Sequence, residues 1–106
     1  MTRENRPLSQ IYKEAGDDWA DKDAAARLLE ETKSLRFAQR CASLGDMPVN
    51  RAEQIVKADP EWYKDVVNTV NVRTEANKAK INVDFIKMRH SEWVSDTANE
   101  RMESKL

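Results

Sequence analysis

The amino-acid sequence predicts an all-α protein, and three observations lead to that class. Only two of the 106 residues are glycine and three are proline, so few positions interrupt a helix. Charged residues make up 35% of the chain, with Glu, Lys and Arg abundant. Apolar residues recur every three or four positions. We therefore expect an elongated antiparallel helical hairpin, made of two long helices and a short connecting helix, that self-associates.

The first long helix is predicted over residues 7–44 of a single domain spanning residues 1–106. Residues 1–6 are polar, and we expect them to be flexible. Pro7 suits a first helical position, and the helix is expected to continue through Gly16 because Trp19 stays in phase with Ala15. Gly45 follows the last apolar position and is a common C-terminal stop.

A turn and a short helix are predicted over residues 45–58. The turn carries Gly45 and Pro48, and both residue types favour turns. Asn50 and Glu53 have the spacing of a capping box, in which each side chain accepts a hydrogen bond from the other's backbone N–H. The sequence therefore predicts a short helix over residues 51–58.

The second long helix is predicted over residues 59–104, roughly 65 Å at ~1.5 Å per residue. Asp59 suits the N-cap and Pro60 the first helical position, and neither Gly nor Pro occurs afterwards. Two stripes of mainly apolar residues follow this helix at helical spacing. The first stripe is Tyr63, Val67, Val70, Thr74, Asn77, Ile81, Phe85 and Met88; the second stripe is Val72, Ala76, Ala79, Val83, Ile86, His90, Trp93 and Thr97.

The two stripes lie on nearly opposite sides of the helix, which is the basis for predicting self-association. Val70 and Val72 are about 200° apart at ~100° per residue. We expect the first stripe, with Phe85, to face the first long helix. The second stripe is then the expected oligomer interface, formed by Val72, Ala76, Ala79, Val83, Ile86 and Trp93.

Basic residues are segregated from acidic ones, although the net charge is only −1. Seven acids and two bases lie between Glu14 and Glu31, and residues 70–90 carry five bases and two acids. Arg73, Lys80 and Lys87 recur at seven-residue intervals and form one basic stripe, and Lys33, Arg36 and Arg40 form another. Such stripes can follow a phosphate backbone in nucleic-acid-binding proteins. The alternative is pairing with acids of the facing helix, such as Glu30 and Glu31. The candidate nucleic-acid-binding residues are Lys33, Arg36, Arg40, Arg73, Lys78, Lys80, Lys87 and Arg89.

The sequence favours no catalytic site, metal or cofactor. His90 is the only histidine and Cys41 the only cysteine, so no His cluster and no disulfide framework can form within one chain. Clustered acids from Asp17 to Asp23 lack the spacing of a calcium-binding loop and are expected to form a solvated face. Neither a secretory signal nor a membrane span is expected, and a reducing cytoplasm fits the single cysteine.

Short runs in the second half resemble a known family. They include Ala58-Asp59-Pro60-Glu61-Trp62-Tyr63, Glu75-Ala76-Asn77-Lys78-Ala79-Lys80, residues 85–89, Glu92-Trp93 and Ala98-Asn99-Glu100-Arg101-Met102. Over about residues 48–106 the chain resembles small helical phage proteins of the UvsY-type recombination-mediator class. The resemblance implies an oligomer that binds single-stranded DNA and helps load a recombinase onto strands covered by single-strand-binding protein. It implies nucleic-acid contact at Lys78, Lys80, Lys87 and Arg89.

Three functions follow as hypotheses. The leading one is a non-enzymatic phage accessory protein in the host cytoplasm that binds single-stranded DNA and assists recombination. Its partners would be further copies of the chain, single-stranded DNA, and a recombinase or single-strand-binding protein. The first alternative is an inhibitor of a host nuclease or defence complex, whose acidic stretch imitates phosphate charge. The second alternative is a structural assembly protein without nucleic-acid contact.

Overall fold

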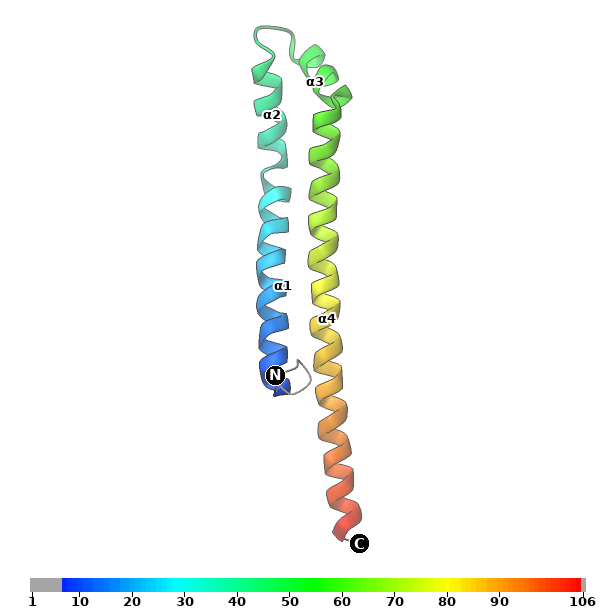
Figure 1. Cartoon of the computed structure of the whole chain (residues 1–106). Helices are drawn as coiled ribbons and strands as arrows, with labels where there is room; N and C mark the ends of the chain where they lie inside the picture. Colours follow the sequence, from blue (N-terminus) through cyan, green and yellow to red (C-terminus); the bar gives the residue numbers. More distant parts are fainter. Residues whose placement is uncertain (1–6, 106) are drawn as a thin grey trace. The chain divides into compact units, whose positions relative to one another are not determined.

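The computed structural model describes residues 7–105 and contains four α-helices (Figure 1). They are α1 (Leu8–Glu31), α2 (Lys33–Ser43), α3 (Val49–Ala58) and α4 (Pro60–Lys105). No strand occurs among these described residues, so the predicted all-α class is confirmed. The expected flexibility of residues 1–6 concerns a part of the chain outside the described range.

The chain divides into two compact units. The first unit combines the start of α1, up to Asp21, with α4 from Asn77 onward, and the second unit is Lys22–Ala76. Within the second unit, α2 and the first turns of α4 lie side by side, with α3 joining them (Figure 1). Each unit therefore contains part of α1 and part of α4.

The first long helix continues through Gly16, as predicted, but is interrupted at Thr32 and therefore forms α1 and α2 rather than one helix. Thr32 has φ −93° and ψ 0°, and its hydroxyl donates a 2.6 Å hydrogen bond to the carbonyl oxygen of Leu28. A threonine bonded back to the preceding turn in this way often bends a helix. The Leu29 carbonyl oxygen accepts a 3.0 Å hydrogen bond from the Arg36 guanidinium. This side-chain donor takes the place of the backbone N–H that would bond to the carbonyl in a continuous helix.

The helix ends follow the predicted signals at two of three points. Gly45, which follows the α2 C-cap residue Leu44, has φ +88°, a conformation that favours glycine. The Asp59 carboxylate accepts a 2.9 Å hydrogen bond from the Glu61 N–H and caps α4, as predicted. The capping box at Asn50 is wrong, because α3 begins earlier, at Val49, and the Pro48 carbonyl accepts from the Ala52 N–H.

Mainly small and branched side chains form the two cores, together with one tryptophan at each. In the first unit, Ala15 of α1 packs with Val83 and Ile86 of α4, and Leu8, Ile11 and Trp19 pack against this cluster. In the second unit the buried residues are Ala26, Ala52, Val56, Trp62, Thr69 and Ala76. Alanines at these contacts let helix axes approach closely, so modest side chains suffice to close the interface.

The structure exchanges the two stripes of α4 relative to the prediction. The second stripe is the internal one, since Ala76, Ala79, Val83 and Ile86 are at most 7% exposed within a single chain. First-stripe residues instead face outward: Tyr63, Val70, Ile81, Phe85 and Met88 are 50% to 68% exposed. Four of the six residues predicted for the oligomer interface are therefore unavailable to a second copy. Val72 is half-buried, and Trp93 is exposed.

The last turns of α4 carry few packing contacts. Between Val94 and Glu103 only Thr97 is half-buried, and every other side chain in that range is exposed, including Met102. Residue Leu8, where α1 begins, lines pockets with His90 and Trp93. The segment after Trp93 thus lies beyond the part of α4 that α1 covers within this unit.

Candidate nucleic-acid interface

The candidate basic residues fall into two sets, four in each unit. Lys33, Arg36 and Arg40 lie on α2, and Arg73 joins them in the second unit. Lys78, Lys80, Lys87 and Arg89 lie on α4 in the first unit. What each cation contacts decides whether it is free to meet a phosphate.

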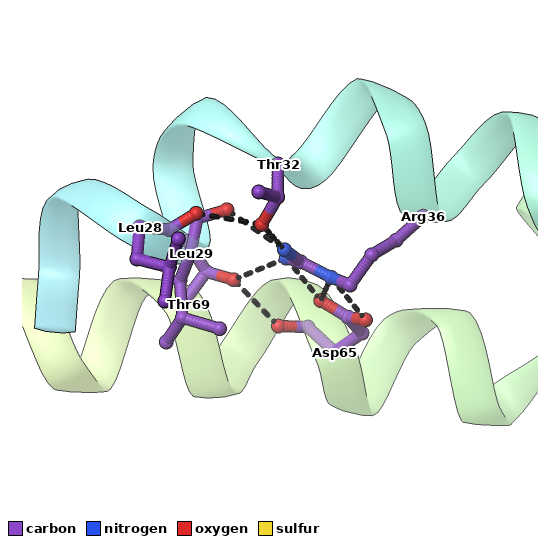
Figure 2. Close-up of polar contacts among 6 residues, drawn as sticks. All are labelled: Leu28, Leu29, Thr32, Arg36, Asp65 and Thr69. Atoms are coloured by element: carbon purple, nitrogen blue, oxygen red, sulfur yellow. Dashed lines mark hydrogen bonds and ion pairs between the residues drawn. The ribbon is translucent and has the colours of Figure 1, made fainter.

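Arg36 is committed to contacts inside the second unit (Figure 2). Its Nε and Nη2 donate to the Asp65 carboxylate at distances between 2.7 and 3.1 Å. The remaining donors reach the Leu29 carbonyl at 3.0 Å, the Thr32 hydroxyl, and the hydroxyl of buried Thr69 at 3.2 Å. A guanidinium has five N–H donors, and these contacts occupy its whole fork.

The electrostatics of this pair follow from those contacts. The hydrogen bond from Arg36 lowers the pKa of the Asp65 carboxyl, and the same bond raises the pKa of Arg36. Both side chains are mostly shielded, at 22% and 16% exposure. Moving Arg36 to a phosphate would leave Asp65 without its charged partner, so these contacts favour a structural role for Arg36 over a phosphate contact.

Arg73 is held in the same manner by α1. Its Nε and Nη2 donate to the Glu30 carboxylate at 2.9 and 2.7 Å, and its Nη1 donates to Asp23 at 2.7 Å. The hydrogen bond from Arg73 lowers the pKa of Glu30. The alternative interpretation of the basic stripe, pairing with acids of the facing helix such as Glu30, is therefore the one the structure shows for Arg73.

These contacts also use part of the acidic stretch. Asp23 and Glu30 are paired with Arg73, and Asp17 is 2.8 Å from Lys13. A nuclease inhibitor that imitates DNA needs carboxylates turned outward to a partner. At least three of the seven acids between residues 14 and 31 have cations of this chain beside them instead.

Three other basic residues lie over aromatic rings. Arg40 is 6.0 Å from the Trp62 ring centroid, Lys80 is 5.8 Å from Trp19, and Arg89 is 5.9 Å from Phe85. A cation at this distance is attracted by the ring electrons without losing its charge. These side chains therefore keep a charge that no carboxylate of the pairs described above neutralises, whereas Arg36 and Arg73 already pair with carboxylates.

An open pocket in the second unit joins cations to aromatic side chains. It has a volume of about 390 Å³ and is lined by Lys33, Ser34, Phe37, Lys57 and Trp62. The Phe37 and Trp62 rings lie 5.1 Å apart at 54° and form its apolar side. No carboxylate lines the pocket, and among the described residues neither lysine has an ion-pair partner. We call this site the Lys33–Lys57 pocket.

The sequence pointed to Lys33 but not to the rest of this pocket. Lys57 is in the last turn of α3, and only the packing of α3 beside α2 brings it near Lys33. Phe37 falls between the basic residues of α2, and Trp62 belongs to a run quoted for the family resemblance. The signal available in the sequence was Lys57 at the end of a short helix, followed closely by Trp62.

The remaining candidates are exposed residues of the first unit. Lys87 lines a second pocket with Leu8, Tyr12 and His90, and Lys78 is exposed. The His90 ring stacks at 6.1 Å on the Trp93 ring. Cys41 is half-buried in the second unit.

Two further findings concern the described residues. Across residues 7–105, His, Cys, Asp and Glu side chains form no group of three or more that could hold a metal ion. None of the four helices, over the same range, combines the length and apolar character needed to cross a bilayer.

Comparison of the chain with protein-family models, with curated proteins and with solved structures finds no match. The residues themselves are therefore the basis for assigning a function.

Proposed function

We propose that the protein is a non-enzymatic accessory factor that binds single-stranded DNA at the Lys33–Lys57 pocket. The observation that carries this proposal is the pairing of two lysines, free of carboxylates, with the Phe37 and Trp62 rings in one open pocket. Single-strand-binding surfaces combine cations that follow the backbone with aromatic side chains that contact bases.

The geometry supports backbone contact more strongly than base contact. Lys33 and Lys57 are exposed, whereas Trp62 is 9% exposed and serves mainly as the wall of the pocket. Half-buried Phe37 offers the accessible ring surface. Arg40, over the Trp62 ring, adds a third cation near the pocket. Binding should therefore depend strongly on salt and weakly on sequence, because phosphate contacts carry no base information.

The proposal includes an arrangement for the whole chain. Pairs of contacts support an antiparallel course of α4 within each unit. In the first unit Trp19 lies beside Lys80 and Leu8 lines a pocket with His90. In the second unit Glu30 lies beside Arg73 and Arg36 beside Asp65. We propose that the units continue into one antiparallel helical hairpin and that copies self-associate. Several Lys33–Lys57 pockets would then follow a single strand.

The biological context rests on the resemblance of residues 48–106 to UvsY-type mediators. That resemblance supports a role in phage DNA recombination, in the host cytoplasm, beside a recombinase and a single-strand-binding protein. A structural assembly protein is the second candidate, and the exposed first stripe of α4 favours it, because an apolar helix face serves assembly with or without DNA.

The test is a titration of a fluorescent oligonucleotide at several salt concentrations. Lys33→Gln with Lys57→Gln should weaken binding to all sequences alike and reduce the slope of log affinity against log salt by about 1.4, at ~0.7 per phosphate contact. The control is Lys13→Gln with Lys64→Gln, which removes two lysines that pair with Asp17 and Glu61 on their own helices. The control should keep the wild-type slope.

Two results would contradict the proposal. If the wild-type protein did not bind the oligonucleotide at low salt, the structural assembly protein would be the better-supported function. An equal loss of slope in both double variants would show that net charge, not the pocket, governs binding.

A further inference from the structure

The exposed face of α4 in the first unit is unusually apolar for a helix that already has a partner. Ile81, Phe85 and Met88 are 67%, 50% and 53% exposed, and they fall on one face at spacings of four and three. The opposite face carries Val83 and Ile86, which are buried against α1. A continuous exposed face of this kind marks an interaction surface. We call it the 81–88 face.

Opposite charges flank the 81–88 face. At ~100° per residue, Asp84 lies about 60° to one side of Ile81 and Arg89 about 80° to the other. Among the described residues Asp84 has no ion-pair partner. The Arg89 guanidinium lies 5.9 Å from the Phe85 ring, at the edge of the face. Each flank thus holds a charge that no acid or base of its own chain compensates by an ion pair in the described range.

We propose that the 81–88 face binds the same face of a second copy, with the two α4 helices parallel. In a parallel pair of helices, the flank that carries Asp84 in one copy lies beside the flank that carries Arg89 in the other. The residues that face each other across these flanks are five sequence positions apart. Asp84 and Arg89 are five positions apart, so Asp84 of each copy meets Arg89 of the other. In an antiparallel pair, the Asp84 flank of one copy lies beside the Asp84 flank of the other, so Asp84 does not face Arg89. Charge complementarity therefore selects both the occupant and its direction.

Two neighbouring asparagines fit the same register. Asn77 lies on the Asp84 flank and Asn82 on the Arg89 flank, again five positions apart, so their amides can exchange hydrogen bonds between copies. Lys78 and Glu92 lie seven positions before and after Phe85, so each falls on the 81–88 face and would meet its own counterpart in a parallel pair. Facing like charges are unfavourable, so the contact should be limited to about Ile81–Met88.

This inference rests on the proposed self-association and adds its surface and direction. The test is sedimentation equilibrium of Asp84→Arg, Arg89→Glu and the double variant, at tens of micromolar, the order at which a dimer of micromolar affinity forms. Each single variant replaces two attractive contacts by two repulsive ones and should weaken the dimer on the order of tenfold. The double variant restores both contacts with reversed sign and should recover the wild-type dimer.

Matched controls separate this register from net charge. Asp21→Arg and Arg51→Glu make the same charge changes at exposed residues of α1 and α3, and both should dimerise as wild type. Circular dichroism of every variant checks that helix content is kept. Ile81→Asp, which charges the face and spares the core, should give a folded monomer.

The outcomes are distinct. A double variant no better than the single ones, with a wild-type dimer present, overturns the parallel register and leaves self-association standing. A dimer untouched by Ile81→Asp overturns the surface. Wild type that stays monomeric overturns the self-association proposal as well. DNA binding at the Lys33–Lys57 pocket, which lies in the second unit, is a separate measurement on the whole chain. The salt dependence of that binding decides the DNA proposal.

Discussion

The Arg36 guanidinium on α2 donates hydrogen bonds from Nε and Nη2 to the Asp65 carboxylate on α4, and the shortest N–O distance is 2.7 Å. The same guanidinium donates to the Leu29 carbonyl at the end of α1 (Figure 2). One side chain therefore connects three helices of the second unit at the point where the first long helix is interrupted. This relationship makes Arg36 and Asp65 the pair whose loss should be felt most in that unit.

Replacing Asp65 by Asn should lower the free energy of unfolding by about 2 kcal/mol, since hydrogen bonds to charged groups are worth ~1.5–3 kcal/mol. The amide keeps the shape of the carboxylate but not its charge, and Arg36 loses its counter-ion. Urea denaturation followed by circular dichroism measures the change. Asp17→Asn, at an exposed pair on one helix, is the control and should unfold as wild type. Equal stability of all three proteins would show that the Arg36 contact is unimportant.

Acid should destabilise the protein. The hydrogen bonds from Arg36 and Arg73 lower the pKa values of Asp65 and Glu30 in the folded state. In the unfolded chain these groups titrate near ~3.9 and ~4.3. Below about pH 5 the unfolded state therefore binds more protons, and stability falls as pH falls through the folded pKa values. Thermal melts between pH 7 and pH 3 should show this decline, with a shallower one in Asp65→Asn. A flat profile would contradict it.

Ile86→Ala and Phe85→Ala should act on different properties, although the residues are adjacent. Ile86 is 6% exposed in the core of the first unit, so its truncation should cost about 3 kcal/mol of folding stability. Phe85 is 50% exposed, so its loss should mainly weaken self-association. Denaturation and sedimentation of both variants separate the effects. If Phe85→Ala proved the more damaging to folding, the internal and external faces of α4 would have to be exchanged.

The two glycines should respond oppositely to alanine. Gly16 is inside α1, and a Cβ there meets nothing within 4 Å. Gly16→Ala should therefore stabilise by up to ~1 kcal/mol. Gly45 has φ +88°, so Gly45→Ala should destabilise by about 1 kcal/mol or more. Melting temperatures of the two variants, moving in opposite directions, would confirm both backbone assignments, and movement in the same direction would refute one.

Much of the fold could be predicted from the sequence because its signals are local. Asp59 and Pro60 mark the start of α4, and Gly45 follows the end of α2, through backbone preferences that need no tertiary partner. The absence of glycine and proline after Pro60 predicts an uninterrupted helix, and α4 is uninterrupted to Lys105. The interruption at Thr32 depends on Arg36, whose guanidinium takes the Leu29 carbonyl, and no local pattern announces that contact.

The internal stripe of α4 could not be chosen from periodicity, because both stripes have the same spacing. The first stripe has the larger side chains, Phe85 and Met88, and was expected inside. The facing surface of α1 offers Ala15, and the close approach it allows suits Val83 and Ile86. For the candidate site, the sequence places Glu30 among the acids that the basic stripe could meet, and Arg73 does pair with Glu30. It does not point to Asp65 as the partner of Arg36, because charge spacing along one helix does not identify a residue on another helix.

Because its C-terminal end is exposed, α4 should open locally more often toward Lys105 than near its buried middle. Beyond Trp93 the backbone hydrogen bonds have almost no buried side chains to protect them, and a helix segment of about ten residues is marginal by itself in water. Amide protons there should exchange with solvent far faster than those near Val83. A protease should trim the chain back toward Trp93 and leave a resistant remainder. The remainder should have the same length alone and at dimer-forming concentration, because the proposed contact with a second copy ends at about Met88.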